Sequence, residues 1–478
     1  MLHLMVVDSA THHPIPCRVH LKNAEGVSQK AGDLPFFHDH FACTGQVSIE
    51  LPPGAYAYEI ERGPEYRPVS GAVTLVSGQD YHLEHALRRF VDLPGRNWYP
   101  GDLHIHRPPE HIEQIMLAED LYVAPVITWW NKKNLWSDRQ PPTDLLAVID
   151  HHRYSHLMGG EDERNGGAFL YFNRSTPLEI TQADKEWPSP ISFLEAKGEG
   201  TWIDIEKPFW WDVPVALAHG FGDSIGLANN HMCRSSMYET EAWGKPRDVE
   251  RLPPPRGNGL WSQEIYYHIL NCGFRIPPSA GSASGVLPNP LGYNRVYVYV
   301  PGEFTHDKWW EGLRAGRCFV TNGPLLLARA AGELPGHVFH SASEVEIPVA
   351  VELTGNDPVP VLEIVQDGMV TRAVSYEEWA ATGTLGKVQF DRSGWFLVRA
   401  ITARTDTFRF ASSAPYYVEV GDATKRISRT SASFFLDWVR ERASRIELSD
   451  PAQRAEVLRY HDRAIAFWED LVKRANAD

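Results

Sequence analysis

The stretch Trp98-Tyr99-Pro100-Gly101-Asp102-Leu103-His104-Ile105-His106 lies where the pattern of the sequence changes. Before it, apolar and polar residues alternate with a period of two, and after it short apolar runs alternate with longer mixed segments. In an extended strand, residues i and i+2 point to the same face, so His104 and His106 can bind one metal ion while Leu103 and Ile105 pack on the other side. The stretch therefore predicts a metal-binding strand that opens an α/β region.

The patterns on either side of this strand divide the chain into four expected units. Residues 1–95 alternate as half-buried strands do and predict an N-terminal β-sandwich of about seven short strands. Residues 96–325 contain apolar runs at 122–128, 168–172, 202–205 and 223–228, which predict parallel strands with crossovers in an α/β layer or barrel. Residues 326–420 predict a C-terminal β-sandwich. Residues 421–478 predict a helical hairpin, whose second helix begins at Ser449-Asp450-Pro451.

Composition narrows the class of function. The formal net charge is -15 and no block of Lys or Arg is present, which argues against a nucleic-acid or anionic-membrane partner. No apolar run approaches the roughly 20 residues that a membrane span requires. The five cysteines are odd in number and far apart, so they predict no disulfide framework, and the N-terminus lacks the pattern of a signal peptide. We expect a cytoplasmic protein that acts on a small molecule, and a homo-oligomer is left open.

Several motifs together resemble the PHP-like metallohydrolases of the CehA/McbA type, a family named for a carbaryl hydrolase. The resemblance covers most of the chain and rests on Gly-Asp-Leu-His-Ile-His at 101–106, Gly-Glu at 160–161, Gly-Tyr-Asn-Arg-Val-Tyr-Val at 292–298, Trp-Glu-Gly-Leu-Arg-Ala-Gly-Arg at 310–317 and Thr-Asn-Gly-Pro at 321–324. The N-terminal β-sandwich, similar to carboxypeptidase regulatory domains, also fits. The resemblance implies a central PHP-like (β/α) barrel that carries a metal-dependent hydrolase site.

The chain departs from this family at several ligand motifs. It has Trp129-Trp130 where relatives carry Asp-His, Gly166-Gly167 where a Gly-His follows the glutamate, Lys207-Pro208 for His-Pro, and residues 282–285 without the late Asp and His. We therefore do not expect the trinuclear site of the family. The ligands that remain are His104, His106, Glu161 and His231. Three imidazoles and one carboxylate suffice for one Zn²⁺, Mn²⁺ or Fe²⁺ with a position left for water.

A bound metal ion lowers the pKa of its water and so supplies the nucleophile. Hydrolysis also needs groups that act on the leaving group and on the charge that develops. Lys207, Arg234 and Tyr238 lie on segments that should follow strands at the site, and we consider them for leaving-group protonation or charge stabilisation. Asp102 is placed to orient an imidazole. Lys207 could equally form a plain salt bridge with Glu206 or Asp212.

Two indole pairs stand near the expected strand ends. Trp129 and Trp130, with Asn131, and Trp210 and Trp211 suit the binding of flat rings, and Asn229 lies beside His231. The same indoles could simply pack against helices. As a binding surface, they indicate a substrate that bears a ring, such as a carbohydrate or an aromatic ester.

Three functions remain open at this point. The leading hypothesis is a metal-dependent hydrolase that acts on an ester, carbamate, phosphoester or glycosidic bond. The second is a metal-dependent carbohydrate lyase or isomerase. The third is a non-catalytic glycan-binding protein on a degenerate PHP-like fold.

Overall fold

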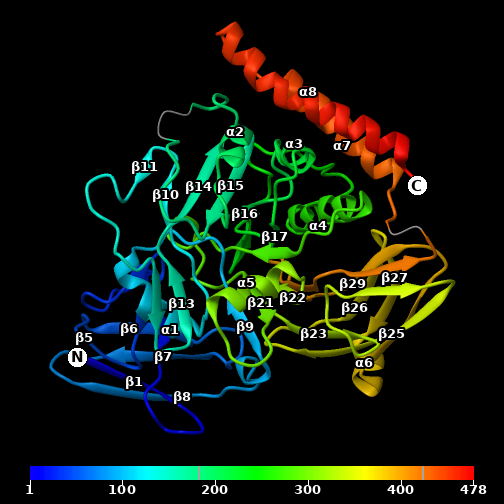
Figure 1. The fold of residues 1–478 in the computed structure, drawn as a ribbon. Helices are drawn as coiled ribbons and strands as arrows, with labels where there is room; N and C mark the ends of the chain where they lie inside the picture. Colours follow the sequence, from blue (N-terminus) through cyan, green and yellow to red (C-terminus); the bar gives the residue numbers. More distant parts are fainter. Residues whose placement is uncertain (181–183, 423–424) are drawn as a thin grey trace.

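The computed structural model describes residues 1–180, 184–422 and 425–478 (Figure 1). Its N-terminal strands form two sheets that pack face to face. The first sheet has the order β5-β1-β8 and the second β3-β4-β2-β6-β7. Their bounds are β1 Leu2–Asp8, β2 Cys17–Asn23, β3 Phe36–Phe37, β4 His40–Cys43, β5 Gln46–Ile49, β6 Gly54–Glu61, β7 Val69–Leu75 and β8 Tyr81–Leu87. Val6 of the first sheet and Val19 and Ile60 of the second lie in one buried cluster, so alternate residues of both sheets form this core.

A seven-stranded sheet forms the middle of the molecule, in the order β11-β10-β14-β15-β16-β17-β20. Its strands are β10 Ile127–Trp130, β11 Lys133–Asn134, β14 Gly159–Arg164, β15 Gly167–Phe172, β16 Trp202–Ile205, β17 Ser224–Ala228 and β20 Pro278–Ala280. Two short hairpins accompany it, β12 Leu146–Ile149 with β13 Arg153–His156, and β18 Met232–Cys233 with β19 Ser236–Met237.

The expectation that all these strands run parallel is wrong. Strand β15 runs antiparallel to both β14 and β16. Its first residue, Gly167, pairs with Arg164, so only Asn165 and Gly166 join the two strands. A parallel connection would need a crossover of a dozen or more residues, and a tight turn therefore imposes the antiparallel direction.

The segment that contains the two histidines lies between the opposite ends of this sheet. The N–H of Leu103 donates to the carbonyl of Ala280 in β20 (2.9 Å), and the N–H of Ile127 in β10 donates to the carbonyl of Ile105 (2.8 Å). The N–H of His106 donates to the carbonyl of Ser284 (2.8 Å). These are isolated hydrogen bonds, so the histidine segment is not the regular strand that the sequence predicts. The predicted strand at 122–128 also begins later, at Ile127, because Pro125 has no N–H to donate.

The C-terminal strands form a large sheet with the order β24-β31-β29-β30-β22-β21-β9, to which β26 and β27 are attached, and a second sheet β23-β25-β28. Their bounds are β9 Trp98–Gly101, β21 Arg295–Tyr299, β22 Cys318–Thr321, β23 Leu325–Ala330, β24 Val338–Ser341, β25 Val345–Thr354, β26 Val361–Gln366, β27 Met369–Ser375, β28 Thr384–Phe390, β29 Gly394–Ile401, β30 Phe410–Ser413 and β31 Tyr416–Val420. Because β22 pairs with β30, the large sheet crosses the expected unit boundary between residues 325 and 326.

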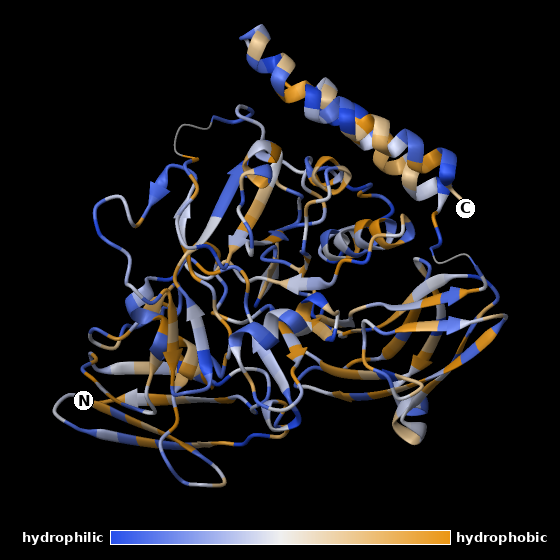
Figure 2. Cartoon of the chain, viewed as in Figure 1, coloured by the Kyte–Doolittle hydropathy of each residue, from blue (hydrophilic) through white to orange (hydrophobic). Residues whose placement is uncertain are grey.

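The helices lie against different sheets, with α1 on the N-terminal sheet, α4 on the central sheet and α6 on the C-terminal sheet, and two helices end the chain. They are α1 Ile112–Glu119, α2 Pro190–Glu195, α3 Val213–Ala218, α4 Gly257–Asn271, α5 His306–Arg314, α6 Tyr376–Thr382, α7 Arg429–Ser444 and α8 Pro451–Arg474. Helices α7 and α8 lie side by side across α3 and α4 (Figure 1). Figure 2 shows hydrophobic and hydrophilic residues interspersed along both helices. The Asp450 carboxylate accepts hydrogen bonds from the first turn of α8, where the Ser-Asp-Pro motif predicts the helix to begin.

A search of the described residues finds no helix that is both long and apolar enough to cross a membrane.

Candidate metal centre

Three of the four predicted ligands converge at one point. The Nε2 atoms of His104 and His106 lie 3.0 Å apart, and the Oε2 atom of Glu161 lies 3.6 Å from the first and 3.2 Å from the second. Glu161 belongs to β14, beside the histidine segment, and its Oε2 atom is buried without a hydrogen-bond partner. Buried polar atoms are normally hydrogen-bonded, so an unpaired carboxylate oxygen that faces two imidazole nitrogens is a typical arrangement for a cation ligand.

A fourth side chain, Glu206, also contacts this centre and was not predicted as a site residue. Its Oε1 atom lies 3.2 Å from Nδ1 of His104, and its Oε2 atom accepts a hydrogen bond from Nε1 of Trp210 (2.7 Å). The ammonium group of Lys207 donates to the same carboxylate. Lys207 thus forms the salt bridge that the sequence left open. The signal for Glu206 was its position directly after the apolar run 202–205, which becomes β16.

The charged groups of this cluster change one another's pKa values. Burial alone would lower the pKa of His104, but the carboxylates of Glu161 and Glu206 raise it to about 10. Burial lowers the pKa of His106 despite its contact with Glu161. Burial would raise the pKa of Glu161, and the charge of His104 outweighs this and holds it at about 2. The two carboxylates therefore favour a positive charge between them.

Asp102 does not orient an imidazole, contrary to the prediction. Its buried carboxylate accepts hydrogen bonds from the main-chain N–H groups of His104 (3.0 Å), Ser282 (3.0 Å) and Gly292 (2.7 Å). The side chain therefore holds the backbone of the histidine segment against two other loops. It positions His104 through the chain rather than through the ring.

The structure does not bring His231 into the group. At this centre, the possible ligand atoms that lie within 4.8 Å of one another are those of His104, His106 and Glu161. The ring of His231 stacks on Tyr238, with centroids 5.0 Å apart, and its Nδ1 atom is buried without a hydrogen-bond partner. Tyr238 is 41% exposed. Asn229 is buried and accepts a hydrogen bond from the N–H of His231, so it supports this loop and does not line a binding surface.

Arg234 and Trp211 lie away from the centre. The Arg234 guanidinium forms ion pairs with Glu59 (2.6 Å) and Glu61 (2.9 Å) of β6, so it joins the central region to the N-terminal sheet. Trp211 is 5% exposed and packs against Trp438 of α7. The predicted catalytic role of Arg234 and the predicted ring-binding role of Trp211 are therefore corrected to structural roles.

Trp129 is buried, and the position of its indole depends on a neighbouring glycine. A Cβ atom added at Gly160 would lie 1.7 Å from Cε2 of Trp129. Strand β10 pairs Trp129 with Gly160, so the indole covers the backbone of β14 immediately before Glu161. The missing side chain at Gly160 is what lets this indole lie flat on the strand.

A Gly160→Ala variant is expected to lose about 1–3 kcal/mol of unfolding free energy, because the new methyl group must displace the buried indole. Denaturant unfolding measures the loss. The double variant Gly160→Ala/Trp129→Phe should recover part of it, since the smaller ring leaves room. A single variant as stable as the parent would show that the indole is free to move.

Trp130 separates two cavities beside the centre. Its ring lies 4.8 Å from that of His106, and its Nε1 atom donates to Glu163 (3.0 Å). One cavity, of about 500 Å³, is also lined by Asn131, Glu163 and Trp243, and Trp243 stacks on the buried Trp210. Burial, with the nearby charge of Glu161, raises the pKa of Glu163 to about 7. The other cavity, of about 750 Å³, is lined by His106, Trp129 and Trp130.

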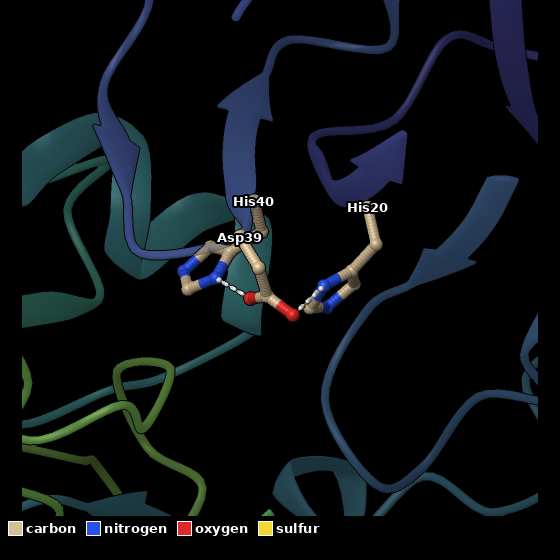
Figure 3. Close-up of side chains that lie close together, drawn as sticks. All are labelled: His20, Asp39 and His40. Atoms are coloured by element: carbon tan, nitrogen blue, oxygen red, sulfur yellow. Dashed lines mark hydrogen bonds and ion pairs between the residues drawn. The ribbon is translucent and has the colours of Figure 1, made fainter. Parts of the chain in front are cut away.

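A second group of possible ligands lies in the N-terminal sheet (Figure 3). The two oxygens of Asp39 face Nδ1 of His20 (3.2 Å) and Nδ1 of His40 (3.1 Å). Nε of Arg18 donates to Nε2 of His20, and the ammonium group of Lys22 lies 3.6 Å from Asp39. Lys22 already balances the charge of the carboxylate, and His20 uses both of its ring nitrogens. Hydrogen bonds and this ion pair therefore account for the group without a metal ion.

Comparisons with known proteins give little to set beside this geometry. No family model matches the chain, and no curated protein matches it. One solved structure that matches contains the fibronectin(III)-like modules of Clostridium thermocellum CbhA. It is 14% identical and has a TM-score of 0.15, and the match covers 20% of this chain and 96% of the other. A likeness this low carries no argument about fold or function.

Proposed function

We propose that the chain is a metal-dependent hydrolase in which His104, His106 and Glu161 hold one divalent transition-metal ion, Zn²⁺, Mn²⁺ or Fe²⁺. The substrate is a small ring-bearing molecule, and the bond is an ester, carbamate, phosphoester or glycosidic bond. The observation that carries the proposal is the buried Oε2 atom of Glu161, which has no hydrogen-bond partner and faces the Nε2 atoms of both histidines.

The donor set fits such an ion. Two imidazoles and one carboxylate are a ligand set of catalytic zinc and of non-haem iron, and they leave coordination positions open. The Oε1 atom of Glu206 lies 3.2 Å from Nδ1 of His104, so it holds the ring with Nε2 toward the centre. Lys207 and Trp210 hold Glu206 in turn, so they act as positioning residues. When bound, a divalent ion supplies Lewis acidity toward a carbonyl or phosphoryl oxygen.

The proposal extends to the fold. In the proposal, the central sheet and the 102–106 segment together form a distorted PHP-like barrel, closed by the bonds of Leu103 to Ala280 and of Ile127 to Ile105. Glu161 and Glu206 then lie on or directly after barrel strands, where active-site residues of such barrels gather. The proposal keeps the four units at 1–95, 96–325, 326–420 and 421–478 as the organisation around this centre, with β9, β21 and β22 of the second unit joined to the large C-terminal sheet.

The proposal is tested by hydrolysis assays on the purified protein loaded separately with Zn²⁺, Mn²⁺ and Fe²⁺. The substrates are p-nitrophenyl acetate, phosphate and glucoside, and a phenyl carbamate. We expect hydrolysis of at least one class that a chelator abolishes and the metal restores, and that Glu161→Gln lacks. The control His40→Gln, in the second histidine group, should keep it. Hydrolysis that survives both chelation and Glu161→Gln would refute the proposal.

A further inference from the structure

The 750 Å³ cavity that reaches His106 is lined by an excess of positive charge. Its charged lining residues are Arg107, Lys132, Lys133, Arg139 and the single acid Glu110. The chain as a whole has 61 acidic and 46 basic residues, so four cations around one cavity go against its composition. Unlike the surface as a whole, this cavity therefore has a field that attracts anions.

Three of these four cations lie against aromatic rings. Among the described residues, none of the four forms an ion pair within 4.0 Å. Instead, the Arg107 guanidinium lies 4.9 Å from the ring centroid of Phe37, the Lys133 ammonium 4.8 Å from that of Trp130, and the Arg139 guanidinium 5.1 Å from that of Trp136. Aromatic faces hold a cation in place without neutralising it. The positive charges thus stay available to a ligand.

Arg107 is the decisive member of this set. It directly follows His106, it is 4% exposed, and its guanidinium has no hydrogen-bond partner within the described chain. The carboxylate of Glu119 acts on this charge only from beyond ion-pair distance. Burying an arginine without a carboxylate in direct contact is costly unless the charge finds a partner. A planar guanidinium in such a place suits a bidentate contact with an oxyanion.

We propose that this cavity binds an anionic group of the substrate, a carboxylate or a phosphate, with Arg107 as the main contact. The inference rests on the proposed function, because it places the anion next to the reacting bond at His106. The substrate is then a small ring-bearing compound with an oxyanion substituent. Its ring lies against Trp130, and Lys132, Lys133 and Arg139 add long-range attraction. Arg107 is a specificity-determining residue for the same site.

Equilibrium binding to the metal-free protein tests the proposal, because an anion cannot then bind to the ion itself. Isothermal titration uses phenylphosphonate and benzoate as the phosphate-like and carboxylate probes, and benzyl alcohol as the neutral ring. We expect at least one anionic probe to bind more tightly than benzyl alcohol. Arg107→Gln should weaken that binding about 10- to 100-fold, as loss of a charged hydrogen-bond pair does. Arg107→Lys should keep part of it, and the exposed control Arg88→Gln should keep all of it.

The pattern of binding identifies the anion and can overturn the inference. Tighter binding of phenylphosphonate assigns a phosphate group, and tighter binding of benzoate assigns a carboxylate. Equal binding of benzyl alcohol and the anions, or an Arg107→Gln variant that binds them as the parent does, would overturn the proposal. Metal content is measured separately, so the two proposals can fail independently. A protein that binds the anionic probes but no metal contradicts only the metal site, and one that binds metal but not the probes contradicts only the anion site.

Discussion

An Arg442→Leu variant is expected to lose about 3–5 kcal/mol of unfolding free energy, because it leaves two buried carboxylates without their cation. Arg442 of α7 is 3% exposed. Its Nε atom lies 2.7 Å from Asp212, and its Nη2 atom lies 2.6 Å from Glu186. This pair of contacts ties the helical tail to two places in the central region, Glu186 before α2 and Asp212 directly before α3. The loss should therefore include detachment of the tail.

Denaturant unfolding and limited proteolysis measure this effect together. The control is Arg440→Leu on the same helix, whose partner Glu469 is exposed and whose loss should cost no more than about 1 kcal/mol. Equal stability of the two variants would contradict the structural role given to Arg442.

The same contact predicts how stability depends on pH. Burial would raise the pKa of Asp212, but the charge of Arg442 outweighs it and holds the pKa well below its ordinary value. A carboxylate with a depressed folded-state pKa contributes stability above the unfolded-state pKa, near 4, and that contribution is lost as pH falls below it. The parent should therefore lose more unfolding free energy between about pH 5 and pH 2 than Arg442→Leu does.

A Glu206→Gln variant is expected to bind the metal ion about 10- to 100-fold more weakly. The carboxylate lies 3.2 Å from Nδ1 of His104, and an amide there lacks the negative charge and can turn its NH₂ group toward the ring. The variant also frees Lys207 from its partner.

Metal affinity is measured by competition with a chromogenic chelator. Glu199→Gln, an exposed change shortly before β16, is the matched control and should leave affinity unchanged. Unaltered affinity in Glu206→Gln would mean that the orientation of His104 does not depend on this carboxylate.

The sequence predicts local structure well where a repeating pattern decides it. The alternation of Cys17, Val19 and Leu21 predicts the buried face of β2, and the apolar runs 202–205 and 223–228 predict β16 and β17. The direction of β15 follows instead from the short turn Asn165-Gly166, which the pattern of apolar runs does not register.

Only part of the candidate site can be predicted from the sequence. The HxH spacing pairs His104 with His106 because period two is a local property of an extended chain. Glu206 and His231 both follow strand-like runs, so spacing cannot tell which one reaches the centre. Strand order decides this, and it brings Glu206 to His104 while the loop after β17 turns His231 toward Tyr238.

Metal content distinguishes the three-ligand centre most directly from its alternatives. Elemental analysis would compare the parent with Glu161→Gln, His231→Ala and His40→Gln after reconstitution with each ion. The account predicts about one equivalent of transition metal in the parent, His231→Ala and His40→Gln, and none in Glu161→Gln. A full equivalent in Glu161→Gln, or a loss confined to His40→Gln, would contradict the claim that His104, His106 and Glu161 hold the ion.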